Sequence, residues 1–96
     1  MPLTVDNDFS PIKVTGTTAT DTVILTKTIG VIKIKFVYWY NITTAGDLCL
    51  LTDENGNEII PMRCEIGGES QMWPIYTAYK SIHCSDMDSG TLYIFH

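Results

Sequence analysis

The sequence predicts an all-β fold: an antiparallel β-sandwich, jelly-roll-like, of about eight short strands. Three observations support this prediction. β-branched and aromatic residues are abundant, and no segment repeats its apolar residues with the 3.6-residue period of a helix. Short strand-like segments also follow one another at a spacing of about 8–12 residues. The 96 residues contain no linker and no internal repeat, so we expect a single domain over residues 1–96.

The N-terminal part of the chain contains a candidate arm and two predicted strands. Residues 1–10 could extend from the domain and reach a neighbouring subunit. The segment Phe9–Thr15 alternates between apolar and polar residues. Pro11 lies within this segment and favours an edge strand, because proline cannot donate to a ladder of hydrogen bonds. A second strand is predicted over residues 21–28.

The longest predicted strand covers residues 31–40 and changes character along its length. Its first half alternates, so Phe36 is expected to point inward with Ile32 and Ile34, while the lysines between them point outward. Its second half, residues 37–40, is apolar on both faces. A strand that becomes apolar on both faces is either covered on its outer side or contacts another molecule.

A β-hairpin and three further strands complete the predicted sandwich. The hairpin strands, 47–52 and 58–66, flank Asn55-Gly56, a pair that favours a type I′ turn. Pro61 marks a bulge or an edge in the second of them. The remaining strands are predicted over residues 72–79, 81–84 and 90–95.

Charge and cysteine content exclude several classes of function. Six basic residues against eleven acidic ones give a net charge of -5, which argues against a nucleic-acid partner. No segment approaches the roughly 20 apolar residues of a membrane-spanning helix. The N-terminus has no secretory signal, and the odd set of three cysteines favours free, buried thiols. We therefore expect assembly in a reducing cytoplasm.

Candidate metal sites are weak, and we expect neither a metal nor a cofactor. A zinc site would have to combine scattered residues, and neighbouring residues of one strand, such as His83 and Cys84, point to opposite faces. The calcium-like acidic segments 53–58 and 85–90 are rich in turn-forming residues, and the first places its glycine too early for an EF-hand. The zinc alternative would use Cys49, Cys64, Cys84, His83 and His96.

Catalytic motifs are also weak, so we expect no enzymatic activity. The sequence contains no phosphate-binding loop, nucleophile elbow or zinc-protease motif. A Cys-His pair formed by Cys84 and His83 would lack a third orienting group. Glu65 and Glu69 remain possible as paired carboxylates, but a small sandwich has little material for a deep cleft.

Aromatic residues are the best candidates for contact with a partner. Aromatic side chains often anchor interfaces or stack on sugars. The candidate contact residues are Tyr38, Trp39, Tyr40 and Trp73.

Three motifs resemble those of small structural proteins of tailed-bacteriophage particles. They are Thr44-Ala45-Gly46-Asp47, Asp53-Glu54-Asn55-Gly56 and the segment from Asp86 to Ile94, which contains Asp88-Ser89-Gly90. The resemblance covers roughly residues 29–96. It implies a non-enzymatic virion component, such as a capsid decoration (cement) protein or a head or tail accessory protein, and it carries no defined site residues.

The resemblance also implies partners and a location. Proteins of this kind are compact β-sandwiches that bind the major capsid protein or another virion protein and often form homo-oligomers, with a trimer favoured here. The chain would then be assembled in the host cytoplasm and reside in the virion. The alternative function is a carbohydrate-binding or receptor-binding module of a tail or fibre.

Overall fold

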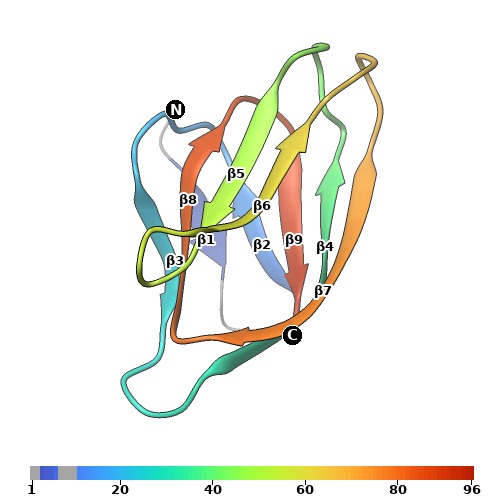
Figure 1. Cartoon of the computed structure of the whole chain (residues 1–96). Helices are drawn as coiled ribbons and strands as arrows, with labels where there is room; N and C mark the ends of the chain where they lie inside the picture. Colours follow the sequence, from blue (N-terminus) through green and yellow to red (C-terminus); the bar gives the residue numbers. More distant parts are fainter. Residues whose placement is uncertain (1–2, 7–10) are drawn as a thin grey trace.

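The computed structural model describes residues 3–6 and 11–96, and it confirms the all-β class (Figure 1). Two antiparallel sheets pack against each other. The larger has the strand order β1-β2-β9-β4-β7, and the smaller has the order β3-β8-β5-β6. The strands are β1 (Thr4–Asp6), β2 (Ile12–Thr15), β3 (Thr22–Thr26), β4 (Ile32–Tyr40), β5 (Leu48–Thr52), β6 (Glu58–Arg63), β7 (Gln71–Tyr79), β8 (Ser81–Met87) and β9 (Thr91–Phe95).

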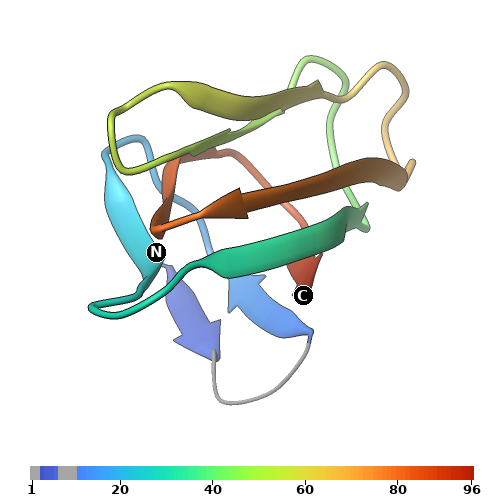
Figure 2. The ribbon, with the colours of Figure 1, turned by 60° about the horizontal axis from the view of Figure 1, so that its bottom comes forward.

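The topology is that of a jelly roll. From β2 to β9 the chain pairs as one long hairpin, β2 with β9, β3 with β8, β4 with β7 and β5 with β6. This hairpin is rolled up so that β4 also pairs with β9, and β5 with β8. Two four-stranded sheets result, and β1 extends the first of them. Figure 2 shows the strands of both sheets from a second direction. The predicted jelly-roll-like sandwich is therefore confirmed.

The tip of this long hairpin is the turn between β5 and β6. Gly56 has a φ of 80°, but Asn55 is not in the positive-φ region. A type I′ turn needs positive φ at both residues, so the predicted turn type is wrong. The Asp53 carboxylate accepts hydrogen bonds from the backbone N–H groups of Asn55 and Asn57, both at 2.9 Å. These bonds stabilise a three-residue loop whose last residue is the glycine.

The N-terminal residues that the structure describes belong to the domain. Residues 4–6 form β1, which pairs antiparallel with β2. They are thus not part of an extended arm, and the rest of the predicted arm, residues 1–2 and 7–10, lies outside the described residues. The edge position inferred from Pro11 is also wrong, because β2 lies between β1 and β9.

The core lies between the two sheets, and all three thiols are in it. Cys49, Cys64 and Cys84 are free and buried, as predicted. The hydrogen bond with Cys84, together with burial, raises the pKa of the Cys49 thiol, so it stays protonated. The apolar core consists of Ile12, Val14, Ile24, Ile32, Ile34, Val37, Trp39, Ile42, Cys49, Leu51, Ile60, Met62, Cys64, Ile82, Cys84, Met87, Leu92 and Ile94.

Strand β4 changes phase at a bulge in its pairing with β7. Ile34 pairs with Thr77 and Phe36 with Pro74, so two residues of β7 face one residue of β4. Before the bulge the even-numbered residues of β4 are buried, and after it the odd-numbered residues are. Phe36 therefore lies on the outer face, and its predicted inward position is wrong.

Candidate interaction surface

The four candidate contact residues are separated by the fold. Trp39 has 0% of its surface exposed and lies in the core. Its indole Nε1–H donates a buried hydrogen bond of 2.8 Å to the backbone oxygen of Ser89. A side chain held in this way cannot contact a partner, so the prediction of Trp39 as a contact residue is wrong.

Tyr38 and Tyr40 lie on the outer face of the larger sheet. Residues that pair directly in an antiparallel ladder point to the same face. Tyr38 pairs with Tyr93, and Phe36 pairs with Phe95, which brings five aromatic residues of β4 and β9 together. We call these five residues the outer aromatic face: Phe36, Tyr38, Tyr40, Tyr93 and Phe95.

The rings of the outer aromatic face stack mainly on one another. Phe36 and Phe95 have ring centroids 4.3 Å apart at an interplanar angle of 20°. Tyr38 and Tyr93 are 6.4 Å apart at 26°, and Tyr40 lies 5.9 Å from Tyr38. Ring faces that cover each other are not free to stack on a sugar. Tyr40 is 49% exposed, and the other four rings are half-buried.

Trp73 occupies a different place, on the edge strand β7. It pairs with the buried Val37, so its side chain lies on the inner side of the sheet, at the open margin of the sandwich. It is 41% exposed, and its Nε1–H donates to Gln71 Oε1 at 3.2 Å. Trp73 is therefore accessible but separate from the outer aromatic face.

Backbone pairing with another chain is hindered at the side of the sandwich that β6 and β7 form. β6 and β7 are the edge strands of their sheets, and each contains a proline, Pro61 and Pro74. Proline removes a hydrogen-bond donor and protects an edge. The accessible surface on this side is thus a face of side chains rather than a free backbone ladder.

Two of the three motifs that carry the phage resemblance, 44–47 and 86–94, meet at one end of the sandwich, whereas the third, 53–56, forms the β5–β6 turn at the other end of β5. Ser89 Oγ donates a hydrogen bond of 2.5 Å to Asp47 Oδ2 and accepts one of 3.1 Å from the Thr43 N–H. Gly90 follows with a φ of 80°, and a Cβ there would lie 2.6 Å from the Tyr40 backbone oxygen. These residues join the 41–47 loop to the turn before β9 (Figure 1). These contacts hold the end of β4 and the start of β9 in place, and these two strands carry the outer aromatic face.

The acidic segment 85–90 contains two neighbouring carboxyl groups, those of Asp86 and Asp88. Burial, together with the hydrogen bond to Asp88 and its charge, raises the pKa of Asp86 to about 6. The Leu48 N–H donates to Asp88 Oδ2 at 2.9 Å. The described residues include no group of three or more His, Cys, Asp or Glu side chains that could hold a metal ion. The calcium alternative therefore gains no support here.

A chain of hydrogen bonds on the smaller sheet escaped the sequence analysis. Asp21 Oδ2 lies 3.0 Å from His83 Nδ1, and His83 Nε2 lies 2.8 Å from Ser81 Oγ. This is the connectivity of a serine-hydrolase triad. Ser81, however, is only 5% exposed, and its Oγ also hydrogen bonds to Thr26 Oγ1 at 2.9 Å.

The surroundings of this chain favour a structural role. A triad aspartate is buried, whereas the side chain of Asp21 is 61% exposed. The bonds link β8 to β3 and to the segment before it. No sequence spacing predicts this arrangement, because its members come from β3, β8 and a loop.

The remaining carboxylate candidates do not form an acid–base pair. Glu69 Oε1 accepts hydrogen bonds from the Glu65 backbone N–H and the Gln71 side chain. These bonds lower the pKa of Glu69, whereas a general acid needs a raised pKa.

The described residues also contain no helix that is long and apolar enough to cross a membrane.

Comparison with known proteins returns no relative. No family model matches the chain, and neither the curated proteins nor the solved structures contain a match.

Proposed function

We propose that this chain is a non-enzymatic structural protein of a bacteriophage particle, a capsid decoration (cement) protein that stabilises the head shell through protein–protein contacts. Its partners would be further copies of itself, with a trimer favoured, and the major capsid protein. The observation that carries the proposal is the outer aromatic face, five aromatic side chains gathered on the outer side of a jelly-roll sheet. Aromatic residues are the typical anchors of protein interfaces.

Three further features support the proposal. Jelly rolls are used by viral capsid domains, although a fold alone does not determine a function. Two of the three motifs that resemble phage structural proteins, 44–47 and 86–94, form the loops next to the ends of β4 and β9. A chain of this size also buries only about 60–65% of its surface on folding, so burial of the aromatic face in an assembly would add stability.

The first test is the mass of the purified chain in solution, measured by light scattering over a concentration series. We expect a stable trimer whose association depends on the outer aromatic face. Tyr40→Glu should shift the equilibrium to monomer, because a carboxylate would be desolvated in the contact. Val23→Glu is a matched control, since Val23 is 53% exposed and Tyr40 49%, but Val23 lies on the other sheet. A monomer at all concentrations would count against preassembled trimers.

The second test is binding to the particle. Phage heads that lack the chain should take it up to a fixed number of copies per shell and then release their DNA at a higher temperature. Tyr40→Glu should abolish the uptake, and Val23→Glu should preserve it. Wild-type chain that fails to bind such heads would overturn the decoration role.

The alternative is a carbohydrate-binding or receptor-binding module of a tail or fibre, and one observation favours it. Trp73 is 41% exposed and lies outside the stacked rows, so its indole could stack on a sugar ring. A glycan screen that quenches tryptophan fluorescence in wild type, but not in Trp73→Phe, would support this alternative over the proposed function.

A further inference from the structure

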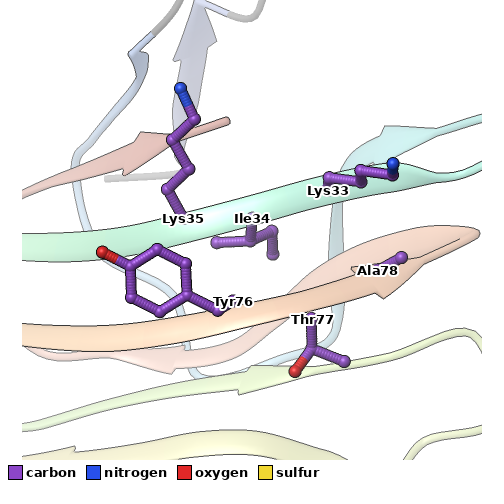
Figure 3. Close-up of a pocket in the computed structure, with 6 residues that line it drawn as sticks. All are labelled: Lys33, Ile34, Lys35, Tyr76, Thr77 and Ala78. Carbon is purple, nitrogen blue, oxygen red and sulfur yellow. The ribbon is translucent and has the colours of Figure 1, made fainter.

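A second surface feature lies on the larger sheet, next to the outer aromatic face. It is an open pocket of about 330 Å³ between β4 and β7, lined by Lys33, Ile34, Lys35, Tyr76, Thr77 and Ala78. Figure 3 shows the three β4 residues on one strand and the three β7 residues on its neighbour. The volume lies at the lower end of the range of about 300–1,000 Å³ that is usual for ligand pockets, so the pocket has room for one side chain.

The bulge between β4 and β7 creates this pocket. The ladder is regular at Lys33–Ala78 and Ile34–Thr77 but shifts before Phe36. Tyr76, in the shifted part, has a φ of 52°, a conformation that a bulky residue rarely adopts. Its side chain is 75% exposed. Strained residues and bulges concentrate at functional sites, and here they leave an aromatic ring standing beside a gap in the ladder.

The accessible lining of the pocket is mostly apolar. The side chain of Ile34 is buried on the inner face of the sheet, so this lining comes from the ring of Tyr76, the methyl group of Ala78 and the stems of the two lysines. Ala78 lies opposite Lys33, and its small side chain leaves space there. The ring of Tyr76 reaches from β7 towards β4 (Figure 3). An apolar or aromatic side chain would bury surface against these groups, whereas a free phosphate ion would not.

The rim of the pocket is positive. Lys33 and Lys35 are both exposed on the outer face, and neither makes an ion pair within residues 3–6 and 11–96. The chain as a whole is acidic, with a net charge of -5, so two lysines side by side are a local cluster of positive charge. Each ammonium group is carried on a flexible four-carbon stem, which lets it reach a carboxylate bound above the pocket.

We propose that this pocket binds an apolar side chain of a protein segment that carries acidic residues on both sides of it. The side chain would enter between Tyr76 and Ala78, and the flanking carboxylates would contact Lys33 and Lys35. This inference deepens the proposed function, because it gives the chemistry of the partner segment next to the outer aromatic face. It is tested on the isolated chain, so its failure is distinct from a failure to bind particles.

The test is a titration of the ¹⁵N-labelled chain with the synthetic peptide acetyl-Asp-Glu-Phe-Asp-Glu-amide, followed by NMR. We expect saturable shifts of the backbone amides of residues 33–35 and 76–78. Two control peptides, one with serine in place of phenylalanine and one with the amides Asn and Gln in place of the acids, should each bind about tenfold more weakly. Shifts confined to other regions, or equal binding of the uncharged peptide, would overturn the proposal.

Charge reversal on the protein provides the matched comparison. Lys33→Glu/Lys35→Glu should weaken binding of the acidic peptide by about tenfold or more, because each exposed charge contact contributes a few-fold in affinity. Lys13→Glu is the control, since Lys13 pairs with Tyr93 on the same face but does not line the pocket. It should change the affinity by less than about twofold. Equal effects of both variants would indicate unspecific attraction and overturn the proposal.

Two further measurements keep the test decisive. If the double charge reversal impairs folding, Lys33→Gln/Lys35→Gln removes the same charges without adding negative ones, and the same loss is expected. Sodium acetate at the carboxylate concentration of the peptide should leave the amides of residues 76–78 unshifted. If acetate reproduces the shifts, the pocket is a simple anion site, and the peptide proposal is wrong.

Discussion

Trp39 and Tyr40 are neighbours in β4, yet they belong to opposite regions of the molecule. Trp39 is completely buried and donates its indole N–H to the Ser89 backbone. Tyr40 is 49% exposed, and its ring lies 5.9 Å from that of Tyr38. The inner region is fixed by packing and by hydrogen bonds to loops, whereas the outer region is held by rings that touch one another. One strand thus supplies stability on one face and a contact surface on the other.

The largest expected effect on stability concerns Trp39 and the inner region. Trp39→Ala should lower the free energy of unfolding by about 3–5 kcal/mol, because it leaves a cavity and an unpaired carbonyl. Tyr40→Ala is the matched change one residue later and should cost less than about 1 kcal/mol. Urea denaturation of both variants measures the difference. Equal losses would contradict the assignment of the two residues to different regions.

Gly90 tests how tightly the loops fix the inner region. Gly90→Ala should destabilise the domain for two reasons, a φ of 80° and a Cβ placed 2.6 Å from the Tyr40 oxygen and 3.0 Å from Trp39 Nε1. Gly56→Ala shares the φ of 80° but meets nothing within 4 Å, so it isolates the conformational cost of about 1 kcal/mol.

The steric part should then appear as a difference between these two glycines. We expect Gly90→Ala to cost about 1–3 kcal/mol more than Gly56→Ala, as measured by thermal or urea unfolding. If the two variants are equally stable, the backbone at the start of β9 moves away at no cost, and the loops do not fix the inner region.

The sequence predicts some parts of this comparison and misses others for a physical reason. Alternation and turn residues were sufficient for the all-β sandwich, and the run Val37 to Tyr40 showed that both faces of the strand are apolar. Which aromatic residue points inward depends on the bulge that Ile75 and Tyr76 of β7 form opposite Lys35 of β4. That bulge is a property of the pairing between two strands far apart in the chain, so Trp39 could not be separated from Tyr40 beforehand.

Contacts between distant strands explain the other gaps. The chain from Asp21 through His83 to Ser81 joins a loop to β8, and the lysine pocket needs both β4 and β7. The motif residues Asp47 and Ser89 were visible in the sequence, but their hydrogen bond depends on the rolled hairpin. Local patterns thus predicted the elements, and the register between the strands determined the surfaces.

A smaller effect tests the outer side of the comparison. Tyr38 and Tyr93 stack across β4 and β9, and such pairs contribute about 0.5–1.5 kcal/mol beyond the area that they bury. A double-mutant cycle with Tyr38→Ala and Tyr93→Ala should give a coupling energy in this range when unfolding is measured on the monomer. Additive losses would mean that the rings do not support each other and that the outer face is ordered only by a partner.

The smallest expected effect concerns Asp86 and depends on pH. Its pKa is raised from 3.8 to about 6, first by burial and then by the hydrogen bond to Asp88 and its charge. The folded state therefore binds this proton more tightly than the unfolded state does. The contribution to stability is complete below pH 4 and is lost as the pH rises through 6. The Oδ1 atom of Asp86 is buried and has no hydrogen-bond partner among the described residues, whereas the buried indole N–H of Trp39 has one.

Asp86→Asn should remove this pH dependence, because an amide keeps a donor for Asp88 and carries no charge. We expect the variant to melt a few degrees higher than wild type at pH 7 and at nearly the same temperature at pH 4, as measured by calorimetry. Glu58→Gln removes one charge from an exposed position on β6 and controls for the change in net charge. A gain of the same size in both variants at pH 7 would show that net charge is responsible. A gain confined to Asp86→Asn would show that the half-buried carboxylate of Asp86, which pairs with Leu50 on the smaller sheet, destabilises the fold at neutral pH.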